Sequence, residues 1–65
     1  MKVEIFMEMQ IEDLQTKINA WLDNNLGITI KHVMPYTVVL QDYFHSNPTQ
    51  ICNQWTEYYT TIFYE

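Results

Sequence analysis

The fold of this chain is decided by its final segment, residues 55–64, which read WTEYYTTIFY. Threonine, tyrosine, isoleucine and phenylalanine are enriched in β-strands, so the segment predicts a strand. Apolar residues occupy both of its alternating faces, which is typical of a strand that is covered on both sides. We therefore expect this strand to be the central one of a sheet and to run antiparallel to both neighbours.

Two earlier segments predict the neighbouring strands. Residues 2–7 alternate, with Val3, Ile5 and Met7 on one face and Phe6 on the other. Residues 28–34 alternate again and are β-branched, so they predict a second strand that ends or bulges at Pro35, with residues 36–44 as its continuation. The cluster HSNPT at residues 45–49 is a strong turn signal.

Between the first two strands the sequence has helical periodicity. The apolar stripe comprises Ile11, Leu14, Ile18, Trp21 and Leu22. Glu12 and Asp13 favour the positive end of the helix dipole, and Gly27 suits a left-handed cap at the other end. One turn apart on this helix, Asp13 and Lys17 are expected to form an ion pair.

The order β-α-β-β predicts a single small α+β domain over residues 1–65, with one helix packed on a three-stranded mixed sheet. Residues 36–54 are expected to form an extended hairpin or arm. An arm that carries Tyr43, Phe44 and His45 suits contact with a second subunit or a partner, and ordinary packing is the alternative.

A domain of 65 residues buries only about 60% of its unfolded surface, so natural domains of this size usually need a further stabilising element. One helix covers one face of the sheet, and the other face is left apolar, which monomers seldom tolerate. We therefore expect a homodimer. Its interface is predicted to comprise Phe6, Val33, Phe44, Trp55, Tyr59 and Phe63.

Charge and composition exclude several classes of function. Eight acidic residues oppose three lysines, for a net charge of −5, which repels nucleic acids and anionic lipids. The longest apolar run is too short to cross a bilayer, and no signal sequence is recognisable before the first strand. With a lone cysteine, Cys52, these features predict a cytoplasmic protein that binds neither nucleic acid nor membrane. A basic protein is the natural partner, and solubility is the alternative reason for the acidity.

The residues offer little for catalysis. The only glycine, Gly27, lies at a helix end where carbonyls are exposed, so it cannot form an oxyanion or phosphate loop. His32, His45 and Cys52 are not spaced as zinc ligands, and a lone cysteine in an apolar context is usually buried and inert. His32 is expected to be a core or interface histidine, with metal binding as the alternative. We expect no enzyme activity, no metal and no cofactor.

Two sets of residues are candidates for partner binding. An acidic patch is predicted from Glu12, Asp13, Asp23, Asp42 and Glu57, although such acids are often only a solvated surface. Trp21 and Trp55 are expected to pack in the core, because without arginine they lack the cations that stacking on nucleic acid requires.

Several segments of the chain together resemble a known family. They are MKVEIF at residues 1–6, Asp13-Leu14 and Ile18-Asn19 in the helix, ITIK at residues 28–31, and Tyr58-Tyr59 with IFYE at residues 62–65. The pattern resembles a small sporulation protein of spore-forming Gram-positive bacteria and similar uncharacterised proteins of their phages. Residues 36–54 look longer than the hairpin connection of that family, so a site specific to this protein is expected there.

The resemblance implies no catalytic residue, and it implies a phage-encoded protein in the host cytoplasm. Our first hypothesis is an inhibitor that mimics DNA and occludes the DNA-binding surface of a basic host protein, such as a nucleoid-associated protein. The second is a protein that sequesters a nucleotide signal between aromatic residues, namely Tyr43, Trp55 and Tyr59. A sporulation-associated role is the third.

Overall fold

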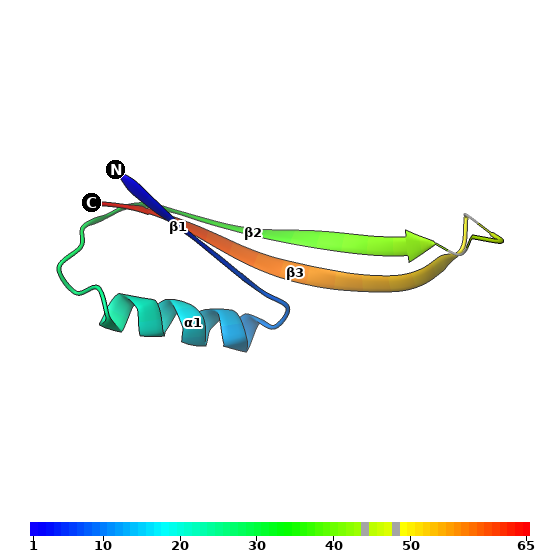
Figure 1. The fold of residues 1–65 in the computed structure, drawn as a ribbon, viewed down its shortest axis with the longest axis horizontal. Helices are drawn as coiled ribbons and strands as arrows, with labels where there is room; N and C mark the ends of the chain where they lie inside the picture. The colour runs from blue at the N-terminus through cyan, green and yellow to red at the C-terminus, as the bar shows by residue number, and fades with distance from the viewer. Residues whose placement is uncertain (44, 48) are drawn as a thin grey trace.

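The structure, a computed structural model, describes residues 1–43, 45–47 and 49–65. It contains strand β1 (Lys2–Glu8), helix α1 (Ile11–Asp23), strand β2 (Ile30–Tyr43) and strand β3 (Ile51–Tyr64). The strands form one sheet in the order β1-β3-β2, and α1 packs on one face of it (Figure 1). The predicted α+β class, the β-α-β-β order and the central place of the last strand are confirmed.

The sheet is antiparallel rather than mixed. β3 pairs antiparallel with β1 on one side and with β2 on the other. β1 and β2 therefore run in the same direction, but β3 separates them, so no two parallel strands are neighbours.

β3 begins earlier than the sequence predicts and carries the hairpin far beyond the helix. β1 pairs only with residues 58–64 of β3, whereas β2 pairs with residues 51–64. The part of the hairpin beyond β1, residues 38–43 and 51–57, is called the arm below; it projects past the end of α1 (Figure 1). The Cα trace consequently measures 54 × 22 × 13 Å.

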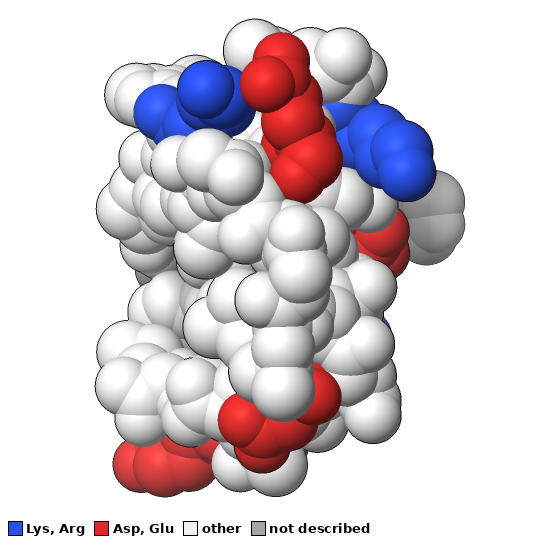
Figure 2. All heavy atoms as spheres, turned by 90° about the vertical axis from the view of Figure 1, so that its left-hand side faces the viewer, with Lys and Arg blue, Asp and Glu red and all other residues white. Residues whose placement is uncertain are grey.

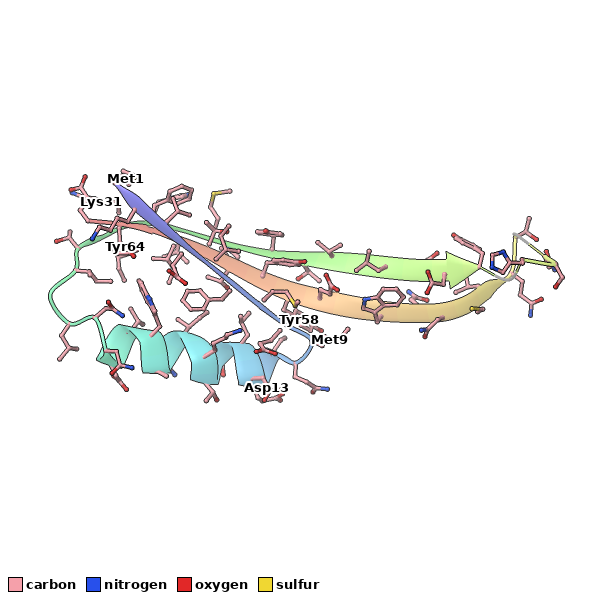
Figure 3. All side chains as sticks on the ribbon, viewed as in Figure 1. Met1, Met9, Asp13, Lys31, Tyr58 and Tyr64 are labelled. Carbon is pink, nitrogen blue, oxygen red and sulfur yellow. The ribbon has the colours of Figure 1, made fainter. Side chains whose placement is uncertain are left out.

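The core lies at the other end of the molecule, where α1 covers β1 and β3. Its buried apolar side chains are Phe6, Leu14 and Ile62. Trp21 packs edge-on against Phe6, with ring centroids 5.5 Å apart, and against Tyr64 at 5.0 Å. Figure 3 shows Tyr58 and Tyr64 on the α1 side of β3, where both pack against this core. Of the predicted apolar stripe of the helix, Leu14, Ile18 and Trp21 form or pack against the core, Leu22 is half-buried, and Ile11 is exposed.

The two ends of the helix differ from their predictions. No residue in the described part of the chain has a positive φ, so Gly27 forms no left-handed cap. Instead α1 ends at Asp23 with Asn24 as its C-cap, and the Asn25 side chain donates to the Trp21 carbonyl at 2.7 Å, which satisfies a carbonyl at the helix end. Lys17 lies 3.3 Å from Glu8 rather than beside Asp13, because the end of β1 lies within its reach.

β2 passes through Pro35 without interruption. Pro35 lies opposite Thr60 in regular register, and proline is tolerated because β2 is an edge strand. The register shifts instead between Ile30 and His32, and again between Asp42 and Tyr43. The first shift places Ile30 opposite Tyr64 and His32 opposite Phe63, so these two residues lie on different faces, contrary to their predicted alternation.

Candidate functional site

The face of the sheet opposite α1, called the open face below, is almost entirely apolar and aromatic. Phe6 and Ile62 point toward α1, so residues that alternate with them on β1 and β3 point away. Residues that lie opposite each other on β2 and β3 share a face, and the two strands stay paired into the arm, so this face continues there. The open face comprises Val3, Ile5, Met7, His32, Met34, Tyr36, Val38, Leu40, Trp55, Glu57, Tyr59, Thr61 and Phe63, with Asp42 and Asn53 at its end in the arm.

This geometry corrects the predicted dimer interface. Phe6 is only 4% exposed because it packs beneath α1, and Val33 lies opposite Ile62 on the α1 side of the sheet. Trp55, Tyr59 and Phe63 do lie on the open face. Phe44 lies outside the described residues.

The open-face residues of β1 and β2 were missed because alternation defines two faces but does not say which one the helix covers. The available signal was the number of apolar residues on each side. Val3, Ile5 and Met7 put three apolar residues on one face of β1, against Phe6 alone among the polar residues of the other. Placing Phe6 in the dimer interface assigns the face with Val3, Ile5 and Met7 to the helix. In the structure that face is the open one.

Two tyrosines and one carboxylate mark the middle of the open face. The rings of Tyr36 and Tyr59 are stacked, with centroids 4.9 Å apart and planes inclined by 4°. Glu57 accepts a hydrogen bond from the Tyr59 hydroxyl at 2.8 Å and one from Trp55 Nε1 at 3.3 Å. The bond to Glu57, followed by burial and the charges of Glu57 and Tyr36, raises the pKa of Tyr59 above its usual value of 10.0.

The five acids predicted as one patch are not brought together. Glu12, Asp13 and Asp23 are exposed on α1, and Asp13 lies on its side away from the sheet (Figure 3). We call these three residues the acidic row; Glu12 and Asp23 are separated by about 16 Å along the helix axis. Asp42 and Glu57 lie on the other side of the sheet, on the open face, where Asp42 is near the end of the arm and Glu57 is nearer the middle. Only the acidic row remains as a candidate acidic surface.

Neither of the two ion pairs in the described residues involves the acidic row. Lys17 pairs with Glu8 at 3.3 Å, and Lys31 with Glu65 at 3.7 Å. Figure 2, a view onto the end that carries both termini, shows lysines gathered on the sheet side and further acidic side chains on the α1 side. The α1 side of this end is therefore the more negative one.

The remaining candidates are far apart. Cys52 is exposed in the arm rather than buried, and His32 lies at the other end of the hairpin, 6.0 Å from the Phe63 ring. Tyr43 pairs with Ile51 near the end of the arm, about 23 Å along the strand from Tyr36. Tyr43 therefore does not join Tyr59 in one aromatic sandwich. Trp21 packs against the core as expected, whereas Trp55 lies on the open face.

Comparisons with protein-family models, with curated proteins and with solved structures gave no match. Within the described part of the chain, no helix is both long and apolar enough to span a membrane. Residues 1–43, 45–47 and 49–65 contain no group of three or more histidine, cysteine, aspartate or glutamate side chains placed to hold a metal ion.

Proposed function

We propose that the protein is a non-enzymatic binding protein that inhibits a basic nucleic-acid-binding protein by covering its nucleic-acid-binding surface. The observation that carries this proposal is the acidic row on α1. Glu12, Asp13 and Asp23 are exposed, and both observed ion pairs are made by other acids. The row therefore keeps its charge free for a basic partner.

Charge also favours rapid encounter with such a partner. The net charge of −5 attracts a basic surface over a distance set by ionic strength, and it repels the nucleic acid that competes for the same surface. The resemblance to sporulation proteins and their phage relatives makes a host nucleoid-associated protein the partner to test first. A sporulation-associated role is the alternative that the same resemblance supports.

The spacing of the row supports occlusion more than a close imitation of DNA. Duplex DNA carries one negative charge per about 1.7 Å of its axis, so a 16 Å length holds about nine charges. The acidic row has three charges over that length. We therefore propose that α1 docks on part of the basic surface and that the rest of the protein blocks access sterically.

The test is competition between this protein and duplex DNA for a purified basic nucleoid-associated protein, measured by fluorescence anisotropy of labelled DNA. We expect displacement of the DNA by the wild-type protein, weaker at higher salt. Glu12→Gln with Asp23→Asn is expected to weaken displacement about tenfold.

The matched control is Asp42→Asn with Glu65→Gln, which also removes two negative charges, both of them outside the acidic row. This control is expected to displace DNA nearly as well as the wild type. Equal losses in the two double variants would show that net charge alone acts, and unchanged displacement by the row variant would refute docking through α1.

A further inference from the structure

The shape of the chain is unusual for its size. A compact chain of 65 residues has a radius of gyration of about 11 Å, whereas the Cα trace has one of 16.3 Å. Its accessible surface is 4981 Å², against about 4,400 Å² for a typical monomer of 7.9 kDa. The chain by itself therefore leaves more surface in water than a stable monomer of this mass.

The excess is concentrated on the open face and in the arm. Only three apolar side chains are buried in the described residues, and all three lie on the α1 side of the sheet. The arm is a two-stranded ribbon, and such a ribbon is marginally stable in water unless a face of it is packed. A partner that covers the open face would also pack one face of the arm.

The open face is large enough for a stable interface. It runs along the 54 Å dimension of the molecule and across the 13 Å one, because α1 is stacked on the sheet along the 22 Å dimension (Figure 1). Covering the whole of that rectangle buries about 700 Å² on each partner, which lies within the range of standard protein interfaces. Its aromatic residues, Tyr36, Trp55, Tyr59 and Phe63, are of the kind enriched in the centre of interfaces.

The distribution of charge indicates which partner suits this face. Two acids lie on the face: Asp42 is near its end in the arm, and Glu57 is in its middle, where both carboxylate oxygens already accept hydrogen bonds within the chain. The acidic row lies on the far side of α1, and Glu8 and Glu65 are paired with lysines. Two negatively charged copies can therefore meet on this face without bringing their unpaired helix acids together, whereas a basic partner is attracted to α1.

We propose that the open face is the interface of a homodimer in which the two sheets pack face to face, about 10 Å apart. Each helix then lies on an outer side of the dimer. The stacked Tyr36 and Tyr59 of each subunit lie near the middle of the interface. This proposal does not rest on the proposed function, because it concerns the opposite side of the sheet from the acidic row.

The first test is the molecular mass of the purified protein, measured by light scattering at micromolar concentration. The wild type is expected at twice 7.9 kDa. Val3 and Val33 give a matched pair, since they are 48% and 46% exposed on edge strands but lie on opposite faces. Val3→Lys is expected to weaken dimerisation at least tenfold, and Val33→Lys to leave it unchanged, with folding of both checked by circular dichroism.

The second test needs no substitution. Met7, Met34 and Met9 are 40%, 46% and 52% exposed in the single chain; Met7 and Met34 lie on the open face, and Met9 lies in the loop after β1, outside the sheet. Under limiting hydrogen peroxide, Met7 and Met34 are expected to oxidise several-fold more slowly than Met9. Three results would each overturn the proposal. The first is a monomeric mass at about 100 µM protein, a concentration at which a standard interface is expected to be formed. The others are equal oxidation of the three methionines, and a dimer that is dissociated by Val33→Lys but not by Val3→Lys.

Discussion

The hydrogen bond from Tyr59 to Glu57 is a contact between single residues that has a measurable titration. It holds the proton of Tyr59, so the pKa of Tyr59 in the folded chain lies above 10.0. Because the folded pKa is the higher one, the contribution of Tyr59 to stability is complete below pH 10.0 and is lost as the pH rises through the raised pKa. Glu57→Gln is expected to lower the pKa of Tyr59, as measured by tyrosinate absorbance.

The assignment is checked with Tyr59→Phe, which is expected to remove the ionisation that Glu57→Gln shifts. If Glu57→Gln leaves the titration of the protein unchanged, the bond between the two side chains does not persist in solution.

Burial decides the cost of removing a single methyl group. Ile62 is 2% exposed in the core, so Ile62→Val is expected to lower the free energy of unfolding by about 0.5–1.5 kcal/mol. Ile11→Val, at an exposed position of α1, is expected to change it by less than about 0.5 kcal/mol. Urea unfolding of both variants measures the difference, and equal losses would contradict the location of the core.

The charges on α1 act on the helix as well as on a partner. Asp13 lies in its first turn and Asp23 is its last residue, where the dipole is unfavourable to an acid. Asp23→Asn is expected to raise the free energy of unfolding by about 0.3–1 kcal/mol, and Asp13→Asn to lower it by a similar amount. Thermal unfolding at low salt checks the two signs, and shifts in the same direction would indicate an effect of net charge alone.

The elements themselves were predictable from the sequence. Helical periodicity identified α1, and the apolar residues on both faces of residues 55–64 placed β3 in the centre. The orientation of β1 was not predictable, because alternation fixes two sets of residues but not which one meets the helix. The bulge between Ile30 and His32 likewise depends on pairing with the end of β3, which is distant in sequence.

The candidate site was less predictable than the fold. The acidic row follows from helical spacing alone, so Glu12, Asp13 and Asp23 were found together. Adding Asp42 and Glu57 required knowing where the arm points and which face of β3 is covered. Long-range packing decides both.

At the scale of the whole molecule, the core and the arm are expected to be separable. Leu40 and Trp55 lie opposite each other, so an Asn-Gly turn that replaces residues 41–54 shortens the hairpin without shifting the register. Because Phe6, Leu14 and Ile62 lie at the other end, the shortened protein is expected to keep cooperative thermal unfolding and the near-ultraviolet signal of Trp21.

Phe6→Ala provides the opposite case, with the arm intact and the core reduced. This substitution is expected to lower the free energy of unfolding by about 3–5 kcal/mol, which is enough to unfold a small domain. Loss of cooperative unfolding in the shortened protein would show that the arm is part of the folding unit.

Pro35, in the middle of an edge strand, bears on whether the protein aggregates at high concentration. β2 is an edge strand of 14 residues that contains three valines and two tyrosines, and long apolar edge strands of this kind favour the addition of further strands and the growth of fibrils. Proline has no N–H, so it interrupts the row of donors that an incoming strand needs. Pro35→Thr is expected to restore that row and to shorten the lag before thioflavin-positive fibrils form, while Thr37→Val, which adds no donor, is expected to have a smaller effect. We therefore expect Pro35 to slow the formation of amyloid along the edge of β2.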